Sequence, residues 1–258
     1  MSWLPQIGSG AIAQFPVSRL RQWRMIANDM ESGERITLAD QYSNQIGWQL
    51  SYQDLTGTEV QNLNDLFTSC QGSALPFSFV DPLANLLGWS EDLTRPDWQT
   101  NLLTAAPNAT DPLGTQRAWT LTNTTTGVLS LQQTLGISGS YVACFSVWVR
   151  SASAGTVVLQ RDAAQSIVAV GPAWNRVFIS GQGTSGAANS TFGIAVNPSQ
   201  QILIFGPQVE AQPYPSAYKQ TVTARGIYPN TWFAADELGI TSTGPGLSSC
   251  QLALRSQI

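Results

Sequence analysis

The most informative segment of this 258-residue sequence is YVACFSVWVR, residues 141–150. Apolar side chains occupy both of its alternating faces, which predicts a central strand of a sheet. Seven further strand-like runs are separated by turn residues and lie at 117–121, 128–132, 156–160, 166–170, 176–180, 191–196 and 202–205. The runs recur every 8–15 residues or so without a helical pattern between them, which is typical of an all-β sandwich or jelly roll.

The composition excludes several classes of function. Hydrophobic residues make up 43% of the chain, as in globular proteins, but charged residues make up only 11%. Without any His there is no Ser–His–Asp or Cys–His triad and no imidazole metal ligand. The net charge is −4, from 12 basic and 16 acidic residues, so the chain lacks the basic face that nucleic-acid binding requires.

Neither a membrane span nor a cofactor is predicted. The longest nearly apolar run, around residues 201–205, is far shorter than the ~20 residues that cross a bilayer. The first charged residue is Arg19, and residues 1–14 lack a basic start followed by an apolar core, so no secretory signal is expected. Cys70, Cys144 and Cys250 lack the paired spacing of a metal site and are expected to be buried free thiols.

The first 82 residues predict strands and a single helix. A hairpin is expected from 21–28 and 34–40 around a Gly-ended turn, followed by a strand over 45–53 with strict alternation. Thr56 and Glu59 have the spacing of a capping box, and Gly72 is a credible helix stop. The apolar face of this helix comprises Val60, Leu63, Leu66 and Phe67.

The end of the chain predicts a second hairpin. Its turn lies at 242–246, and Cys250, Leu252 and Leu254 then alternate with polar or small residues. A hairpin of this size is not stable alone, so it is expected to pair with the N-terminal strands. We therefore predict an insertion: residues 1–84 plus 220–258 form one β-sandwich domain with one α-helix, and residues 85–219 form an inserted jelly-roll β-sandwich.

Four segments of the predicted insert occur in an order that is familiar from a known family. They are NLLGWSEDLTRPDW at 85–98, FSVWVRS at 145–151, WNRV at 174–177, and FGPQVE at 205–210 with YPSAY at 214–218. Together they resemble the carbohydrate-binding-type β-sandwich modules of bacteriophage tail fibres and tail-tip proteins. The resemblance implies a jelly roll whose two ends are adjacent, and which either contacts host-surface polysaccharide or serves as a protein spacer.

The flanking parts resemble the β-sandwich of phage distal-tail and minor-tail proteins. The segments that carry this resemblance are the hairpin around ESGER at 31–35, the strand ending at Tyr52, the helix with LNDLF at 63–67, and PFSFVDP at 76–82. The resemblance implies a non-enzymatic tail-tip or baseplate protein that forms a homo-oligomeric ring. It also implies other phage tail proteins (tail tube, hub and fibres) as partners, and a place in the virion after assembly in the host cytoplasm.

Few residues are candidates for a functional site. Trp98 and Trp119 lie among amides and charged residues, where an exposed indole could serve as a platform for a sugar ring. Arg19, Arg21 and Arg24 surround Trp23 and are either a subunit interface or a solvated strand face.

Two other functions remain open. In a stand-alone carbohydrate-binding adhesin the jelly roll would work by itself. In a glycan depolymerase Glu91 and Asp92 would supply the paired carboxyl groups, although their place in a turn favours capping of backbone amides. The mass of the protein in solution distinguishes the stand-alone adhesin from a ring-forming subunit. An assay for glycan turnover tests the depolymerase.

Overall fold

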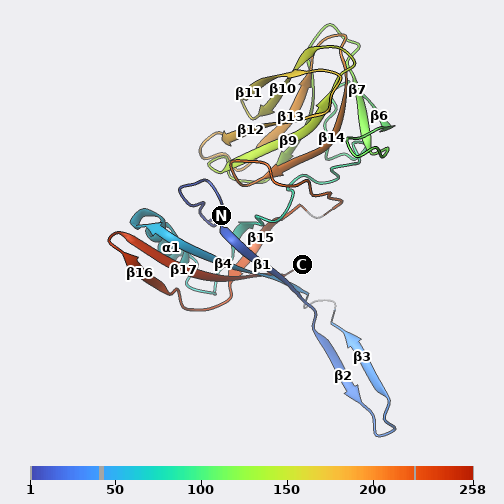
Figure 1. The fold of residues 1–258 in the computed structure, drawn as a ribbon. Coiled ribbons are helices and arrows are strands. Elements are labelled where there is room, and N and C mark those ends of the chain that lie inside the picture. The colour runs from blue at the N-terminus through green and yellow to red at the C-terminus, as the bar shows by residue number, and fades with distance from the viewer. Residues whose placement is uncertain (1, 41–43, 224, 258) are drawn as a thin grey trace. The chain divides into compact units, whose positions relative to one another are not determined.

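The computed structural model describes residues 2–40, 44–223 and 225–257. Residues 1, 41–43, 224 and 258, which belong to the ranges predicted for the domains, lie outside the described residues. The chain divides into two compact units. The first comprises Met1–Gly8, Ile12–Phe79 and Tyr228–Ile258, and the second comprises Ser9–Ala11 and Val80–Ile227. Both are built mainly from strands (Figure 1), which confirms the predicted fold class.

A six-stranded sheet organises the first unit. Its path runs β1 (Gln14–Gln22), β4 (Gln45–Thr56), β17 (Leu247–Gln257), β15 (Ile227–Phe233) and β5 (Phe77–Val80), and β16 (Ile240–Gly244) pairs with β17. β17 runs antiparallel to β4, with Ser256 opposite Ile46 and Leu252 opposite Leu50. The expected pairing of the C-terminal hairpin with the N-terminal strands is therefore confirmed.

The sheet and the helix of the first unit share one core. Along β4, Ile46, Trp48, Leu50 and Tyr52 are buried while their neighbours are more accessible, as the alternation predicts. Helix α1 (Gly57–Ser69) begins with the predicted capping box and buries Leu63 and Leu66. Each of these signals is local, because it depends only on side-chain spacing within one element.

Strands β2 (Met25–Asp29) and β3 (Arg35–Ala39) form a separate two-stranded ribbon (Figure 1). The backbone N–H of Met30 donates to Glu34 at 2.8 Å, and that of Gly33 donates to Met30 at 2.9 Å, which closes the turn. The hairpin is thus where it was predicted, but residues 21 and 22 belong to β1. Every residue of β2 and β3 is exposed.

The second unit is a sandwich of two antiparallel sheets. The four-stranded sheet has the order β11 (Ala164–Val170), β10 (Gly155–Arg161), β13 (Ser190–Val196) and β8 (Leu129–Leu135). The five-stranded sheet has the order β12 (Asn175–Gln182), β9 (Val142–Arg150), β14 (Gln201–Glu210), β7 (Ala118–Thr122) and β6 (Thr104–Ala109). All eight predicted runs are strands, and β9 is an interior strand as expected. β6, which contains Pro107, was missed.

The core of the second unit lies between the two sheets. Phe145 on β9 packs against Phe192 on β13, with ring centroids 6.5 Å apart.

Cys70, Cys144 and Cys250 are buried and free, as predicted. Among the described residues, no helix has both the length and the apolar character needed to cross a bilayer.

Candidate functional site

Trp98 and Trp119 do not form an exposed platform. Trp98 is 5% exposed and Trp119 is 7% exposed. The indole N–H of Trp98 donates to the carbonyl of Trp89 at 3.0 Å, and that of Trp119 donates to the carbonyl of Glu91 at 3.0 Å. Each indole therefore packs as a core side chain with its one donor satisfied. The prediction that these two rings contact sugar required exposed indoles, and the structure shows both of them buried.

The neighbouring carboxylates cap turns and pair with arginine. Asp92 accepts from the backbone N–H of Thr94 at 3.1 Å and from Arg95 Nε at 2.8 Å. Its hydrogen bond with the Thr94 hydroxyl is the main cause that lowers the pKa of Asp92. Glu91 Oε1 lies 3.3 Å from a terminal guanidinium nitrogen of Arg117. A glycosidase acid needs a raised pKa, so Asp92 is not set up for that role.

A strap formed by residues 211–219 crosses the outer face of the five-stranded sheet. Tyr218 packs on two side chains of that face, with ring centroids 6.1 Å from Trp148 and 5.3 Å from Phe205. Arg176 donates to the carbonyl of Ser216, and its guanidinium lies 4.4 Å from the Trp148 ring. The strap closes this part of the sheet, so a glycan cannot stack on Trp148 and Phe205 there.

The buried carboxylate of Glu210 anchors the strap. It accepts from Lys219 Nζ at 2.7 Å, from the backbone N–H of Ser216 at 2.9 Å and from Gln208 Nε2 at 2.7 Å. Burial opposes ionisation, but the hydrogen bonds from Lys219 and Ser216 and the charge of Lys219 outweigh it and lower the pKa of Glu210. The strap is therefore held to the end of β14 by a charged contact.

The strap presents one aromatic side chain outward. Tyr214 is 69% exposed, and its ring lies 6.2 Å from that of Phe178 on β12, which is 42% exposed. Gln212 Nε2 donates to the carbonyl of Tyr214 at 2.8 Å, and prolines precede and follow this tyrosine. A fixed, exposed aromatic pair can pack against the C–H face of a sugar ring while the phenol hydroxyl makes a hydrogen bond. The two flanking prolines indicate a rigid segment, but no pattern in the sequence indicates that the tyrosine ring is exposed.

The predicted interface residues lie at one edge of the first unit. Arg19 and Arg21 are on β1, the strand at one end of the six-stranded sheet, opposite Trp48 and Ile46 of β4. Trp23 is 62% exposed in the connection to β2. Arg24 lies 3.8 Å from Asp40 at the base of the hairpin. All four predicted residues are exposed, and they adjoin the hairpin.

The hairpin itself carries exposed aliphatic side chains. Ile26 is 51% exposed and its cross-strand neighbour Leu38 is 62% exposed. Ile36 lies two residues from Leu38 and therefore shares its face. Exposed large hydrophobic side chains in and around the hairpin comprise Trp23, Met25, Ile26, Met30, Ile36 and Leu38. A concentration of this kind marks an interaction surface.

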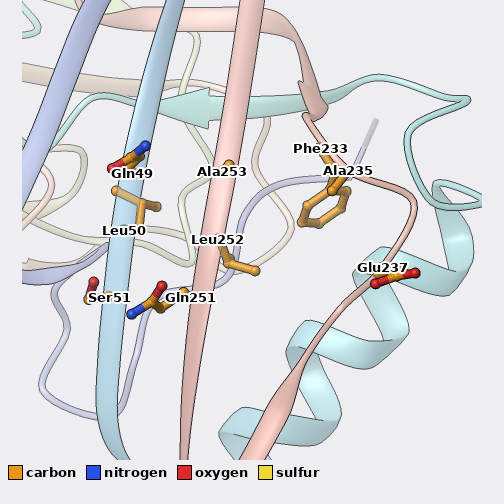
Figure 2. Close-up of a pocket in the computed structure, with 9 residues that line it drawn as sticks. All are labelled: Gln49, Leu50, Ser51, Phe233, Ala235, Glu237, Gln251, Leu252 and Ala253. Carbon is orange, nitrogen blue, oxygen red and sulfur yellow. The ribbon is translucent and has the colours of Figure 1, made fainter.

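A hollow of about 400 Å³ lies on the first unit between β4, β17 and the segment after β15. Figure 2 shows Gln49 and Ser51 on β4, Gln251 on the neighbouring β17, and Glu237 on that segment. Glu237 is the one ionisable side chain among its described lining residues. The hollow therefore holds no acid–base pair. Among the residues the structure describes, no group of His, Cys, Asp or Glu could hold a metal ion.

No protein-family model matches the chain, and no curated protein matches it either. The enzymatically active domain of tailspike protein 4 from bacteriophage CBA120 is 14% identical, with a TM-score of 0.40, and the match covers 51% of this chain and 22% of the tailspike chain. The C-terminal family 22 carbohydrate-binding module of Clostridium thermocellum Xyn10B is 16% identical, with a TM-score of 0.43, and the match covers 53% of this chain and 99% of the module. These likenesses concern the fold alone.

Proposed function

We propose that this chain is a structural subunit of a bacteriophage tail tip or baseplate. In this proposal the first unit associates with copies of itself in a ring and with other tail proteins. The second unit is displayed as a module that contacts host-surface polysaccharide. The family resemblance of both parts of the sequence supports the virion setting, and the exposed aliphatic hairpin carries the proposal of self-association.

The hairpin supports self-association because it is poorly stabilised as an isolated ribbon. A two-stranded ribbon without a packed face is marginally stable in water. Ile26, Ile36 and Leu38 share one face of the ribbon, and each aliphatic side chain contributes about 1.5–3 kcal/mol when it is fully buried. A surface in a second copy that covers this face would stabilise both the hairpin and the assembly.

The mass of the full chain in solution tests this function. We expect native mass spectrometry and sedimentation velocity to give a defined oligomer, and Ile26→Ser/Leu38→Ser to give monomers with an unchanged circular-dichroism spectrum. Ile167→Ser is the matched control, because Ile167 is also an exposed aliphatic strand residue (73%) but lies on the second unit. Wild-type protein that stays strictly monomeric at ~100 μM, far above the Kd of a stable contact, would contradict the proposal.

A stand-alone glycan-binding adhesin is the second candidate function, and the pair of Phe178 and Tyr214 favours it. Glycan arrays and calorimetry with the full chain test it. We expect Tyr214→Ala and Phe178→Ala each to weaken binding about tenfold, since one aromatic contact contributes roughly 1–2 kcal/mol. Leu113→Ala is the control, because Leu113 is exposed (73%) elsewhere on the same unit. A monomer that binds glycan through this pair favours the adhesin over the tail subunit.

A further inference from the structure

We infer that a groove on the outer face of the six-stranded sheet binds a neutral oligosaccharide. This groove, here called the glutamine groove, runs along β4 and β17 and is formed by the residues of these strands that point away from the buried core. They are Gln45, Gly47, Gln49, Ser51 and Gln53 on β4, and Gln251, Ala253, Arg255 and Gln257 on β17. The inference adds a glycan site on the first unit to the proposed function and does not depend on self-association.

Among the residues the structure describes, four hollows lie in a row along these two strands. The hollow shown in Figure 2, of about 400 Å³, shares Gln49 and Ala253 with a hollow of about 280 Å³. In the other direction it shares Ser51 and Gln251 with a hollow of about 370 Å³. The fourth hollow, of about 190 Å³, adjoins the second one at Gln45. Because neighbouring hollows share lining residues, they form one continuous groove.

The groove is long enough for several sugar rings. Its lining on β4 extends from Gln45 to Gln53, and a strand advances about 3.3 Å per residue, so this stretch spans about 26 Å. The segment after β15 borders the groove on the side of β17 through Ala235 and Glu237 (Figure 2). Leu20 of β1 borders it on the side of β4. A linear ligand can therefore lie along the strands between these two borders.

The occupant of this groove has to be recognised by side chains rather than by backbone pairing. β4 lies between β1 and β17 in the sheet, and β17 lies between β4 and β15. The backbone groups of both strands are therefore used in ladders with their neighbours. An extended peptide binds a sheet by adding a strand to its edge, and the face of the sheet offers it no such ladder. The groove favours a ligand whose polar groups can reach side chains, as the hydroxyl groups of a sugar do.

The exposed amides of the groove are complementary to hydroxyl groups. Cross-strand pairs place a long side chain beside a short one, with Gln251 opposite Ser51 and Gln49 opposite Ala253. The amides thus alternate between β17 and β4, and each has a short neighbour beside it. A side-chain amide carries both donors and an acceptor, and a hydroxyl group also donates and accepts. Adjacent hydroxyls of one sugar ring can therefore form two hydrogen bonds with one amide.

One end of the groove adds an aromatic side chain. Trp232 on β15 is half-buried and lies opposite Arg255 of β17. It lines the last hollow together with Gln45 and Gln257. An indole ring that stays partly accessible can pack against the C–H face of a sugar ring. The groove thus combines amides with an aromatic surface, and sites for small ligands combine a few polar groups with aromatic side chains in the same way.

The groove carries little charge. Among the described residues that line its four hollows, the charged side chains are Glu237 and Arg255. One is negative and the other is positive, so they do not make a basic surface. A polyanion such as a nucleic acid or an acidic polysaccharide requires such a surface. A neutral glycan is therefore the chemical class that fits this lining.

Binding of linear hexasaccharides to the full chain tests the inference. The chain is probed with an array of gluco-, xylo-, galacto- and mannohexaoses and with a hexamer of galacturonic acid, and then by calorimetry with the neutral hexaose that gives the strongest signal. We expect a neutral hexaose to bind, and Gln49→Ala/Gln251→Ala to weaken its binding by about tenfold or more, because the hydrogen bonds of two amides are lost. Gln61→Ala is the matched control, since Gln61 is exposed on helix α1 of the same unit.

A second variant tests the groove without removing an amide. Ala253 is exposed on β17, where a strand tolerates an aromatic residue. In Ala253→Phe the added ring would occupy space that two of the hollows share, and we expect binding to weaken by about tenfold or more. All variants are also measured together with Tyr214→Ala/Phe178→Ala, which removes the exposed aromatic pair of the second unit. Binding by the two units is then measured separately.

Three results would overturn the inference. They are the absence of neutral hexaose binding in the Tyr214→Ala/Phe178→Ala protein, equal binding of the galacturonic acid hexamer, and groove variants that bind like Gln61→Ala. A change in the mass of the oligomer without a change in glycan binding would also overturn it, because the groove would then hold another copy. The proposed tail function is judged separately, by the mass of the Ile26→Ser/Leu38→Ser protein.

Discussion

Replacing Glu210 with glutamine is expected to loosen the strap of the second unit. The substitution keeps the shape of the side chain but removes its charge. The contact with Lys219 Nζ at 2.7 Å and the one with the backbone N–H of Ser216 at 2.9 Å then lose their charge assistance. Glu210 is 1% exposed, so water does not replace the lost interactions.

The size of the effect follows from these contacts. A hydrogen bond to a charged group contributes about 1.5–3 kcal/mol, and breaking a buried pair costs about 3–5 kcal/mol. The Lys219 side chain is 31% exposed and is partly solvated once unpaired, which reduces the cost to about 2–3 kcal/mol. For a unit of this size, ~1 kcal/mol moves Tm by about 2–4 °C, which gives a decrease of about 4–12 °C.

The same change alters the response to acid. The pKa of Glu210 is lower in the folded state than its ordinary value. A depressed pKa contributes stability that is present above the unfolded pKa, about 4.3 for glutamate, and is lost as the pH falls through the folded value. Wild type therefore loses this contribution below about pH 4, whereas Glu210→Gln lacks it at every pH. The difference in Tm between the two proteins should shrink on acidification.

Thermal unfolding followed by calorimetry between pH 3 and 7, a window set by the carboxyl pKa values, measures both effects. Glu237→Gln, which removes an exposed carboxylate on the other unit, is the matched control and should leave the sandwich transition unchanged. A Glu210→Gln protein that unfolds within ~1 °C of wild type at pH 7 would refute the reasoning, since that shift corresponds to less than about 0.5 kcal/mol.

Three further predictions concern single elements. Thr56→Ala removes the capping box of α1 and should lower the free energy of unfolding of the first unit by about 0.5–2 kcal/mol, as measured by urea titration. Gly193→Ala should destabilise the sandwich by about 1–3 kcal/mol, because a Cβ there would lie 2.4 Å from the carbonyl oxygen of Leu131. Gly127→Ala, which meets nothing within 4 Å, should leave stability unchanged. Trp119→Phe should lower the Tm of the sandwich rather than glycan binding, because the indole is buried and hydrogen bonded.

Local patterns identified most of the secondary structure from the sequence. The alternation of buried and accessible residues along β4 and β17 follows from the period of an extended chain. The capping box of α1 depends on two residues three positions apart. Two of the strands that were missed contain a proline, which weakens the local signal: Pro107 in β6 and Pro229 in β15.

The candidate site could not be predicted in the same way. The surroundings of Trp98 and Trp119 in the sequence are polar, yet both indoles are buried, and the carbonyl that accepts from Trp119 lies 28 residues earlier in the chain. Tyr214 stands between two prolines and its ring is exposed, whereas Glu210 and Arg176 both hold the strap at Ser216, two residues further on.

Most of the strands, the helix and the apolar face of β4 and β17 could be predicted from the sequence alone, because those properties depend on neighbours along the chain. Which edge of the first sheet the N-terminal segment covers and which aromatic rings reach solvent became evident only from the folded structure. These properties depend on pairs such as Leu4 with Ser78 and Tyr218 with Trp148, whose members are far apart in the chain and carry no pattern that identifies their partner.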